Sequence, residues 1–345
     1  MELGITTFAE TTPDPVSGAV PDSGRRLREV VEEVEVAEAV GLAVYGVGEH
    51  HRADFAASAP AVVLAAAAAR TSRIRLTSAV TVLSSDDPVR VFQDFATLDL
   101  LSEGRAEIIA GRGSFTESFP LFGYDMADYD ELFAEKLELL LAIRDTERVT
   151  WSGRHRAPLT DQAVYPRPHQ QRLPIWIGVG GNPESVVRAG LLGLPMALAI
   201  IGGQPDRFAP LADLHRRALA EVGLTAADAP TAVHAHGFVA DDVEAATAVF
   251  YPPYAATMSQ LGRERGWGPM SRAQFDGATS PSGSLVFGGP DEVTAKIVRM
   301  RRVLGIDRFM LHVSVGTMPH ADVLRSIELF GTKVAPLVEA ALAED

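Results

Sequence analysis

The strongest constraint on the fold is an alternation of short apolar segments with longer amphipathic segments along almost the whole chain. The apolar segments have the length and composition of buried strands, and the segments between them repeat apolar residues at helical spacing. Eight strands are expected, at residues 3–8, 43–48, 74–83, 106–110, 174–179, 195–201, 231–240 and 308–315. Helices are expected at residues 25–40, 59–71, 88–102, 130–148, 183–192, 206–222, 290–304 and 321–339, and a further helix begins near residue 242. Because the strands are too apolar to have one face in water, we expect a parallel sheet covered on both sides.

Eight successive strand–helix units predict an α/β fold, the TIM (β/α)8 barrel. An open doubly wound sheet is less favoured, because nothing in the sequence marks a second domain. We therefore expect residues 1–345 to form one domain. Two irregular insertions rich in proline and glycine, at residues 149–172 and 251–284, interrupt the alternation. The second is either a mobile lid over the strand ends or a variable connection, and its length favours the lid.

Composition narrows the range of partners and compartments. The net charge is −14, and no run of lysine and arginine exceeds two residues, which disfavours nucleic acid and anionic membrane surfaces. The chain has no cysteine, so disulfides, thiolate catalysis and cysteine-ligated metals are excluded. The first residues lack the pattern of a signal peptide, and the apolar stretch at residues 59–69 is too short to span a bilayer. A soluble cytoplasmic protein is expected.

A candidate anion site follows the fourth expected strand. Residues 106–110 run directly into Gly111, Arg112, Gly113 and Ser114. The glycines permit a tight turn, and the guanidinium group can bind two oxygens of a phosphate. Ser114 adds a hydroxyl group and a backbone N–H. Because ligands of α/β proteins bind where the strands end, these residues are expected to bind an anion, with a solvated surface turn as the alternative.

A second glycine-rich segment contains Gly178, Gly180 and Gly181 and enters a helix at Pro183. Free backbone N–H groups and the helix dipole favour an anion at such a position. The segment resembles a dinucleotide fingerprint, but the third glycine is missing and the next strand ends without an acidic residue for a ribose. A mononucleotide phosphate suits it better.

Three polar residues, Glu49, His50 and His51, follow the second expected strand. Catalytic groups of barrel enzymes occur at this end of the strands, and a neutral imidazole can accept a proton near pH 7. If the strand persists, its successive side chains point in opposite directions, so only one histidine would face the pocket. A hydrogen-bonded structural histidine is the alternative. In the third strand, the small residues Ser78 and Ala79 leave room for a flat ligand.

Two further histidines, His234 and His236, lie two positions apart in a strand and therefore on the same side of it. No other cluster of potential ligands is evident in the sequence. We therefore expect these side chains to line the barrel, and metal binding is the less favoured alternative.

These motifs occur in an order similar to that of the luciferase-like flavin-dependent monooxygenases. The segments that carry the resemblance are Glu49-His50-His51, Ser78-Ala79, Asp86-Asp87-Pro88-Val89-Arg90, residues 98–105, Gly111-Arg112-Gly113 and residues 173–178. Each segment is modest alone, and their ordered combination is specific. The resemblance covers residues 1 to about 335 and implies a TIM barrel that binds FMN, or a deazaflavin in sister branches, at the strand ends.

The resemblance also assigns residues to roles. It implies cofactor contacts, with the phosphate or the ring, from Ser78, Ala79, Arg112, Ser114, Gly178, Gly180, Gly181 and Ser185. It places a non-prolyl cis peptide at Ser78–Ala79, and His50, beside Glu49, at the catalytic position. Where the luciferases have acidic and hydroxyl side chains, this chain has Gly180 and Gly181, so the backbone would hold the phosphate.

The implied function is that of an FMN-dependent monooxygenase that uses reduced flavin and O2 to oxygenate a small organic substrate. Residues 111–120 resemble the FMN-using branch more than the deazaflavin branch. Because no nicotinamide site is evident, a separate NAD(P)H:flavin reductase is expected to supply reduced FMN. A homodimer without a bound metal is also expected. A deazaflavin-dependent dehydrogenase and a flavin-binding protein without turnover are the alternatives.

Overall fold

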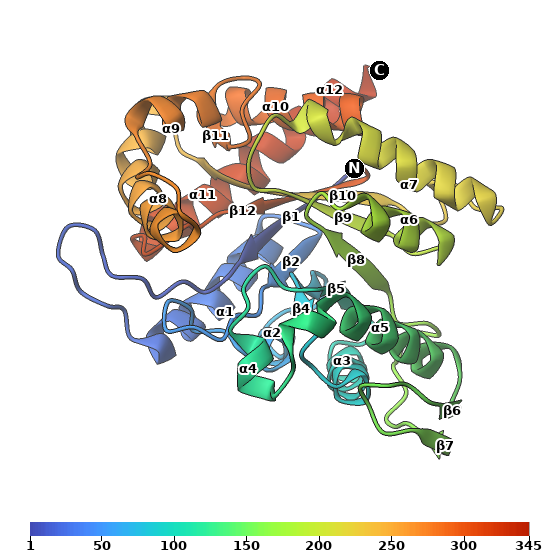
Figure 1. Ribbon diagram of the computed structural model, residues 1–345. Coiled ribbons are helices and arrows are strands. Elements are labelled where there is room, and N and C mark those ends of the chain that lie inside the picture. The colour runs from blue at the N-terminus through green and yellow to red at the C-terminus, as the bar shows by residue number, and fades with distance from the viewer. Residues whose placement is uncertain (345) are drawn as a thin grey trace.

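The computed structural model describes residues 1–344 and shows a closed barrel of eight parallel strands surrounded by helices (Figure 1). In the order in which they pair, the barrel strands are β1 (Glu2–Thr7), β2 (Val44–Val47), β3 (Arg75–Ser78), β5 (Ala106–Gly111), β8 (Ile175–Val179), β9 (Met196–Ile200), β10 (Thr231–Val239) and β12 (Arg308–His312). Every pairing around the barrel is parallel, and β12 closes it by pairing with β1. The predicted TIM barrel is confirmed.

Helices cover the outside of the barrel (Figure 1). They are α1 (Ser23–Ala39), α2 (Pro60–Ala68), α3 (Pro88–Leu101), α4 (Ser118–Phe122), α5 (Tyr129–Asp145), α6 (Pro183–Leu191), α7 (Ala209–Glu221), α8 (Val243–Arg265), α9 (Arg272–Thr279), α10 (Pro290–Leu304), α11 (His320–Leu329) and α12 (Ala335–Ala343). Two short strands, β4 (Thr81–Val82) and β11 (Val286–Gly288), pair with β5 and β10. In the part of the chain that the structure describes, no helix has the length and apolarity needed to cross a membrane.

Local sequence determines how α1 forms and which way it faces. The carboxylate of Asp22 caps the first turn by accepting a hydrogen bond from the backbone N–H of Arg25. Val30, Val34 and Ala37 follow at helical spacing and are fully buried. Burial of a valine side chain stabilises a fold by about 1.5–3 kcal/mol relative to exposure. The cap therefore fixes the start of the helix, and the apolar stripe fixes its inward face.

The third predicted strand, residues 74–83, is interrupted in the structure. β3 ends at Ser78, and a non-prolyl cis peptide bond joins Ala79 to Val80 before β4 begins. The bond implied by the resemblance, at Ser78–Ala79, therefore lies one position further along the chain.

The predicted insertion at residues 149–172 contains more structure than expected. It overlaps an antiparallel hairpin formed by β6 (Arg148–Trp151) and β7 (Leu159–Ala163). In β6 the side chains of Val149 and Trp151 are buried, whereas the residues that alternate with them are exposed. This two-residue period is the signal of a strand, and the surrounding prolines and glycines obscured it.

The prediction that residues 251–284 form an irregular loop is wrong. Helix α8 continues through Pro252 and Pro253 to Arg265, and α9 follows. A proline inside a helix costs about 3 kcal/mol because it removes a hydrogen bond and crowds the preceding turn. Aromatic packing offsets that cost. The ring centroids of Phe250 and Tyr254 lie 5.4 Å apart, and Tyr254 lies 5.7 Å from Phe275 of α9.

Candidate functional site

A cavity of about 340 Å³ lies at the carboxyl ends of the barrel strands. Its walls come from the segments that follow β1, β2, β3, β5 and β8 and from side chains of β9, β10 and β12. Seven of the predicted site residues line it, namely Glu49, His50, Ala79, Arg112, Ser114, Gly178 and Gly180. Residues that are far apart in the sequence therefore meet at one place, as expected for a barrel.

Three of the predicted site residues, Ser78, Gly181 and Ser185, do not line the cavity. The hydroxyl of Ser78 donates a hydrogen bond to the carbonyl oxygen of Ile109 at 3.2 Å and accepts one from its backbone N–H at 3.1 Å. It therefore joins β3 to β5. Gly181 adopts a φ of +119° in the turn before α6, and the side chain of Ser185 is buried within that helix.

Two strands in the floor of the cavity carry glycine where they pass Val80. A Cβ atom on Gly111 would lie 2.6 Å from one methyl group of Val80, and a Cβ atom on Gly178 would lie 2.8 Å from the other. Both distances are too short for a side chain. Ala197 and Ala199 of β9 extend this floor with small apolar groups. The surface suits a planar ring.

One end of the cavity has the character of an anion site. The guanidinium of Arg112 lies 5.2 Å from the ring centre of Tyr129 and forms an ion pair with Asp130. The Tyr129 hydroxyl in turn donates to the carbonyl oxygen of Gly113 at 2.7 Å, which ties the turn to α5. Asp130 is largely exposed, so its ion pair contributes only about 0–1 kcal/mol and leaves Arg112 able to bind a phosphate.

The start of α6 faces this same end. The side chain of Asn182 caps the helix by accepting from the backbone N–H of Glu184 at 2.8 Å. A Cβ atom on Gly180 would meet no other atom of residues 1–344 within 4 Å, so the backbone there is open to a ligand. Asn182 also accepts from the backbone N–H of Ser185 at 3.4 Å, and Pro183 has no N–H, so the free N–H groups expected at this helix start are occupied. The guanidinium of Arg112 remains the group with the right charge and shape for a phosphate. Arg112, Ser114 and Gly180 together form the anion end of the cavity.

Glu49, His50 and His51 form the histidine end. The imidazole of His50 is enclosed by aromatic rings, with the centroid of Phe55 at 4.1 Å, Phe8 at 4.7 Å and Phe115 at 5.1 Å. Burial, together with the neighbouring charges of His51 and Arg52, lowers the pKa of His50 to about 3. His50 is therefore neutral at physiological pH and presents an aromatic, apolar surface.

Glu49 contacts His51 and not His50. One carboxylate oxygen lies 2.8 Å from Nε2 of His51, and the other accepts the backbone N–H of Val82 at 2.9 Å. This hydrogen bond raises the pKa of His51, and the charges of Glu49, Glu117 and Asp86 act in the same direction. Both histidines line the cavity because β2 ends at Val47, before the alternation of a strand would separate them.

A buried polar cluster lies beneath the histidine end. His234 lines the cavity, and the ring of His312 lies 5.2 Å from it and 4.7 Å from that of His236. Nε2 of His312 lies 3.1 Å from a carboxylate oxygen of Glu10, whose other oxygen accepts from the Ser314 hydroxyl at 2.9 Å. Burial raises the pKa of Glu10 to about 7 and lowers the pKa of His236 and of His312 to about 3.

Residues of the site differ in how much signal they carried in the sequence. Asn182 carried some, because it is a polar residue that precedes the proline at the start of a helix. Glu10 and His312 are 302 positions apart and meet only because the barrel closes. The aromatic enclosure of His50 combines residues from three separate loops, and no local pattern predicts such a grouping.

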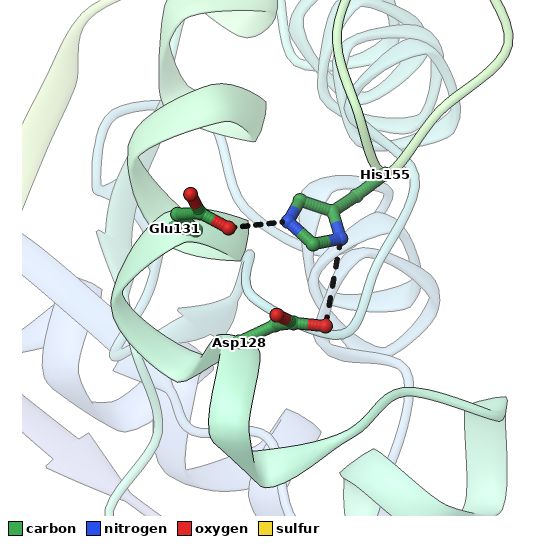
Figure 2. Close-up of side chains that lie close together, drawn as sticks. All are labelled: Asp128, Glu131 and His155. Atoms are coloured by element: carbon green, nitrogen blue, oxygen red, sulfur yellow. Dashed lines mark hydrogen bonds and ion pairs between the residues drawn. The ribbon is translucent and has the colours of Figure 1, made fainter.

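A separate cluster contains Asp128, Glu131 and His155, whose potential ligand atoms lie within 4.8 Å of one another (Figure 2). Nε2 of His155 lies 3.1 Å from Glu131, and Nδ1 lies 3.8 Å from Asp128. Arg154 also donates to Glu131 at 2.6 Å. This arginine balances the acidic charge, so ion pairs that fasten the β6–β7 insertion to α5 account for the cluster without a metal.

The relatives of this chain among known proteins include uncharacterized proteins and a named monooxygenase. The chain is 32% identical over 181 residues to the uncharacterized protein y4wF of Sinorhizobium fredii, a match that covers 51% of this chain and 52% of that protein. It is 24% identical to y4vJ of the same organism over 92% of this chain and 93% of that protein. It is 32% identical to the N-acetyl-S-alkylcysteine monooxygenase of Bacillus subtilis over 52% of this chain and 53% of that enzyme. Some matches thus span about half the length of the relative.

Solved structures share the fold over nearly the whole chain. The monooxygenase RslO1 from Streptomyces bottropensis is 24% identical, with a TM-score of 0.83 and coverage of 97% of this chain and 99% of that one. The oxygenating constituent of 3,6-diketocamphane monooxygenase of Pseudomonas putida, in complex with FMN, is 20% identical, with a TM-score of 0.75 and coverage of 97% and 98%. An F420-dependent secondary alcohol dehydrogenase is 17% identical, with a TM-score of 0.77 and coverage of 98% of each chain.

The family comparison is the most extensive. The model that describes the luciferase-like monooxygenases matches residues 1–308, which include every strand of the barrel up to the start of β12 and every residue that lines the cavity except Met310. The motifs at Glu49, Arg112 and Gly178 lie within this match. The chain therefore belongs to the luciferase-like monooxygenase family.

Proposed function

We propose that this protein is an FMN-dependent monooxygenase, which uses reduced flavin and O2 to oxygenate a small organic substrate with an apolar part. The observation that supports it most directly is that one cavity combines an anion end, which suits a phosphate, with a floor of glycine and small apolar residues, which leaves room for a ring. The family and its monooxygenase members are consistent with this proposal.

The residues present fit FMN. Arg112, Ser114 and the open backbone at Gly180 would hold the phosphate. The floor of Gly111, Gly178 and small apolar residues would support the ring. When bound, reduced FMN supplies the electrons that activate O2.

The protein would bind the substrate beside the ring and exclude water. Phe8, Phe115 and the neutral ring of His50 give this part of the cavity an apolar surface. Such a surface favours an uncharged organic group and keeps bulk water from the reacting atoms. We also propose that a separate NAD(P)H:flavin reductase supplies the reduced FMN, because the sequence contains no dinucleotide fingerprint.

A deazaflavin-dependent dehydrogenase is the second candidate. An F420-dependent secondary alcohol dehydrogenase shares the fold, and the F420-dependent glucose-6-phosphate dehydrogenase of Amycolatopsis mediterranei is 32% identical over 45% of this chain. A hydride-transfer enzyme of this kind would not consume O2.

Binding and oxygen uptake separate the candidates. Titration of the purified protein with FMN and with F420 should show tighter binding of FMN. With reduced FMN and a panel of apolar thioethers and ketones, O2 should be consumed and a product heavier by one oxygen atom should form. Preferential binding of F420, with anaerobic hydride transfer to or from a substrate, would overturn the proposal in favour of the dehydrogenase. Binding of FMN without any turnover would favour a flavin-binding protein.

A further inference from the structure

The histidine end contains two adjacent imidazoles in opposite surroundings. His50 is packed among aromatic rings, and among residues 1–344 its ring nitrogens have no hydrogen-bond partner. His51 is hydrogen-bonded through Nε2 to Glu49 at 2.8 Å, and its ring contacts that of Phe122 at a centroid distance of 5.1 Å. Both rings line the cavity. Only one of them has a partner that can stabilise a positive charge.

The position of His51 is also fixed. The second oxygen of Glu49 accepts the backbone N–H of Val82, so the carboxylate cannot rotate away from the imidazole. With Nε2 bound to Glu49, Nδ1 is the ring atom left for a ligand. A carboxylate that orients an imidazole and favours its protonated form is a recurring arrangement in proton transfer.

We propose that His51, oriented by Glu49, is the residue that delivers protons in the cavity, and that His50 is a neutral contact for the apolar part of the ligand. The family resemblance implied instead that His50, beside Glu49, occupies the catalytic position. This assignment rests on the proposed oxygenase function, and it names a catalytic residue, His51, and a positioning residue, Glu49, for that reaction.

The proton balance of the reaction gives His51 its role. With reduced FMN as its anion, the overall reaction is FMNH⁻ + O2 + substrate + H⁺ → FMN + oxygenated substrate + H2O. One oxygen atom leaves at the oxidation level of water and needs a proton. The Nδ1–H bond of the His51 imidazolium breaks, its electron pair stays on nitrogen, and the proton joins the departing oxygen. A proton from solvent then restores the imidazolium.

Several other charged groups face His51 and determine how it titrates. Asp86 lies in the segment after β4, and Glu117 lies at the start of α4; both act on His51 in the same direction as Glu49. Lys136 of α5 lies behind Asp86 and offsets part of its charge. The acids dominate, so the surroundings favour imidazolium.

The first test follows protonation directly and needs neither cofactor nor turnover. In the protein labelled with ¹⁵N-histidine, the ring signals of His51 should titrate above the ordinary value of about 6.5, whereas those of His50 should not titrate between pH 5 and 9. The variants H50Q and H51Q assign the signals. Glu49→Gln should lower the midpoint of His51 by about one unit or more, because a neighbouring carboxylate shifts an imidazole by about 1–3 units. Titration of His50 in this range, or a His51 midpoint unchanged by Glu49→Gln, would overturn the assignment.

The second test follows the reaction. His51→Gln should reduce product formation by about 100- to 10,000-fold, the usual contribution of a positioned acid or base, while FMN still binds. Product formation should fall as the pH rises and His51 loses its proton, and in Glu49→Gln this fall should occur at a lower pH than in the wild type. The conservative variant Glu49→Asp should restore part of the wild-type pH profile. His50→Gln should instead mainly raise the KM for an apolar substrate. If His50→Gln abolishes turnover and His51→Gln does not, the assignment is overturned.

The two tests fail separately from the proposed function. A wild-type protein that binds FMN but oxygenates nothing would contradict the oxygenase function. In that case the titrations, repeated with oxidised FMN bound, still decide the assignment. A His51 midpoint that moves when FMN binds supports a role at the ligand, and a midpoint that stays in place identifies the Glu49–His51 pair as structural.

Discussion

The two ends of the cavity are built in opposite ways. The anion end is formed by a turn and a helix start, and its main charge, Arg112, forms an ion pair with the exposed Asp130. The histidine end is formed by buried side chains over a cluster that contains Glu10, His236 and His312. Under the proposed function, the anion end would determine affinity for a phosphate, and the histidine end would determine proton chemistry at some cost in stability.

The largest expected effect concerns Glu10, beneath the histidine end. Its pKa is raised from 4.5 to about 7 by burial. A carboxyl group whose pKa is higher in the folded than in the unfolded chain stabilises the fold fully below the unfolded pKa, and this contribution is lost as the pH rises through about 7. Glu10→Gln should therefore reduce the fall in the free energy of unfolding between pH 4.5 and pH 8 by roughly 3 kcal/mol, at about 1.4 kcal/mol per unit.

Urea denaturation at several pH values measures this effect. The matched control is Asp130→Asn at the anion end, where the pair is exposed and worth about 0–1 kcal/mol at any pH. If Glu10→Gln leaves the pH dependence unchanged, the carboxyl is not protonated in the fold, and the two ends do not differ as described.

The next effect concerns Arg112 and the phosphate. A charge-assisted, bidentate contact is worth roughly 1.5–3 kcal/mol, so Arg112→Ala should weaken FMN binding by about 10- to 150-fold. Riboflavin has the same ring without the phosphate, and its affinity should hardly change. Arg112→Lys should recover part of the loss. Equal weakening of both ligands in a folded variant would show that Arg112 does not bind the phosphate.

A substitution in the floor should give the opposite signature. Gly111→Ala places a Cβ atom 2.6 Å from Val80. Overpacking of this kind costs about 1–3 kcal/mol, and the displaced side chain would rise into the space for the ring. FMN and riboflavin should weaken equally. Gly180→Ala is the control, because its Cβ atom meets nothing within 4 Å, so only FMN should be affected there. If Gly111→Ala weakened FMN binding but not riboflavin binding, the phosphate and not the ring would lie against the floor of the cavity.

The sequence predicted the barrel well and the insertions poorly, for a physical reason. A buried parallel strand is a local pattern, so β1, β8 and β9 could be located from their own residues. The start of α8 near residue 242 was predicted, but its continuation to Arg265 was not, because Pro252 and Pro253 break the local pattern and packing against α9 compensates. The anion end was nearly as local, since Arg112 and Ser114 belong to one consecutive turn and Gly180 belongs to a second glycine-rich segment.

The histidine end shows the limit of local reasoning. The residues Glu49, His50 and His51 were identified from the sequence. The hydrogen bond between Glu49 and His51, however, depends on β2 ending at Val47, two residues before Glu49. The aromatic enclosure of His50 and the contact between Glu10 and His312 depend on closure of the barrel. Side-chain partners across such distances leave no signature in one sequence.

The smallest expected effect concerns the end of α8, which lies close to both ends of the cavity. The guanidinium of Arg52, next to the histidine end, donates to the two carboxylate oxygens of Glu264 at 2.6 and 2.8 Å. The guanidinium carbon of Arg265 lies 5.4 Å from the ring centre of Phe115. Its Nη2 donates to the carbonyl oxygen of Ser114, a residue of the anion end, at 3.4 Å. If this segment opens as the predicted lid, the Arg52–Glu264 pair holds it closed.

Trypsin cleavage measures that opening, because a helix must unfold locally before a protease can cut it. The pair is partly exposed and worth about 0–1 kcal/mol, so Arg52→Ala should raise the rate of cleavage after Arg263 and Arg265 by up to about 5-fold. The matched control is Arg325→Ala, which removes a 3.1 Å ion pair to Asp241 just before the other end of α8 and should leave this rate unchanged.

Bound FMN should slow cleavage in the wild type if the segment closes over the ligand. If Arg52→Ala and Arg325→Ala accelerate cleavage equally, α8 unfolds as a whole and its end does not act as a lid. If neither has an effect and FMN gives no protection, this end of the helix is a fixed wall shared by both ends of the cavity.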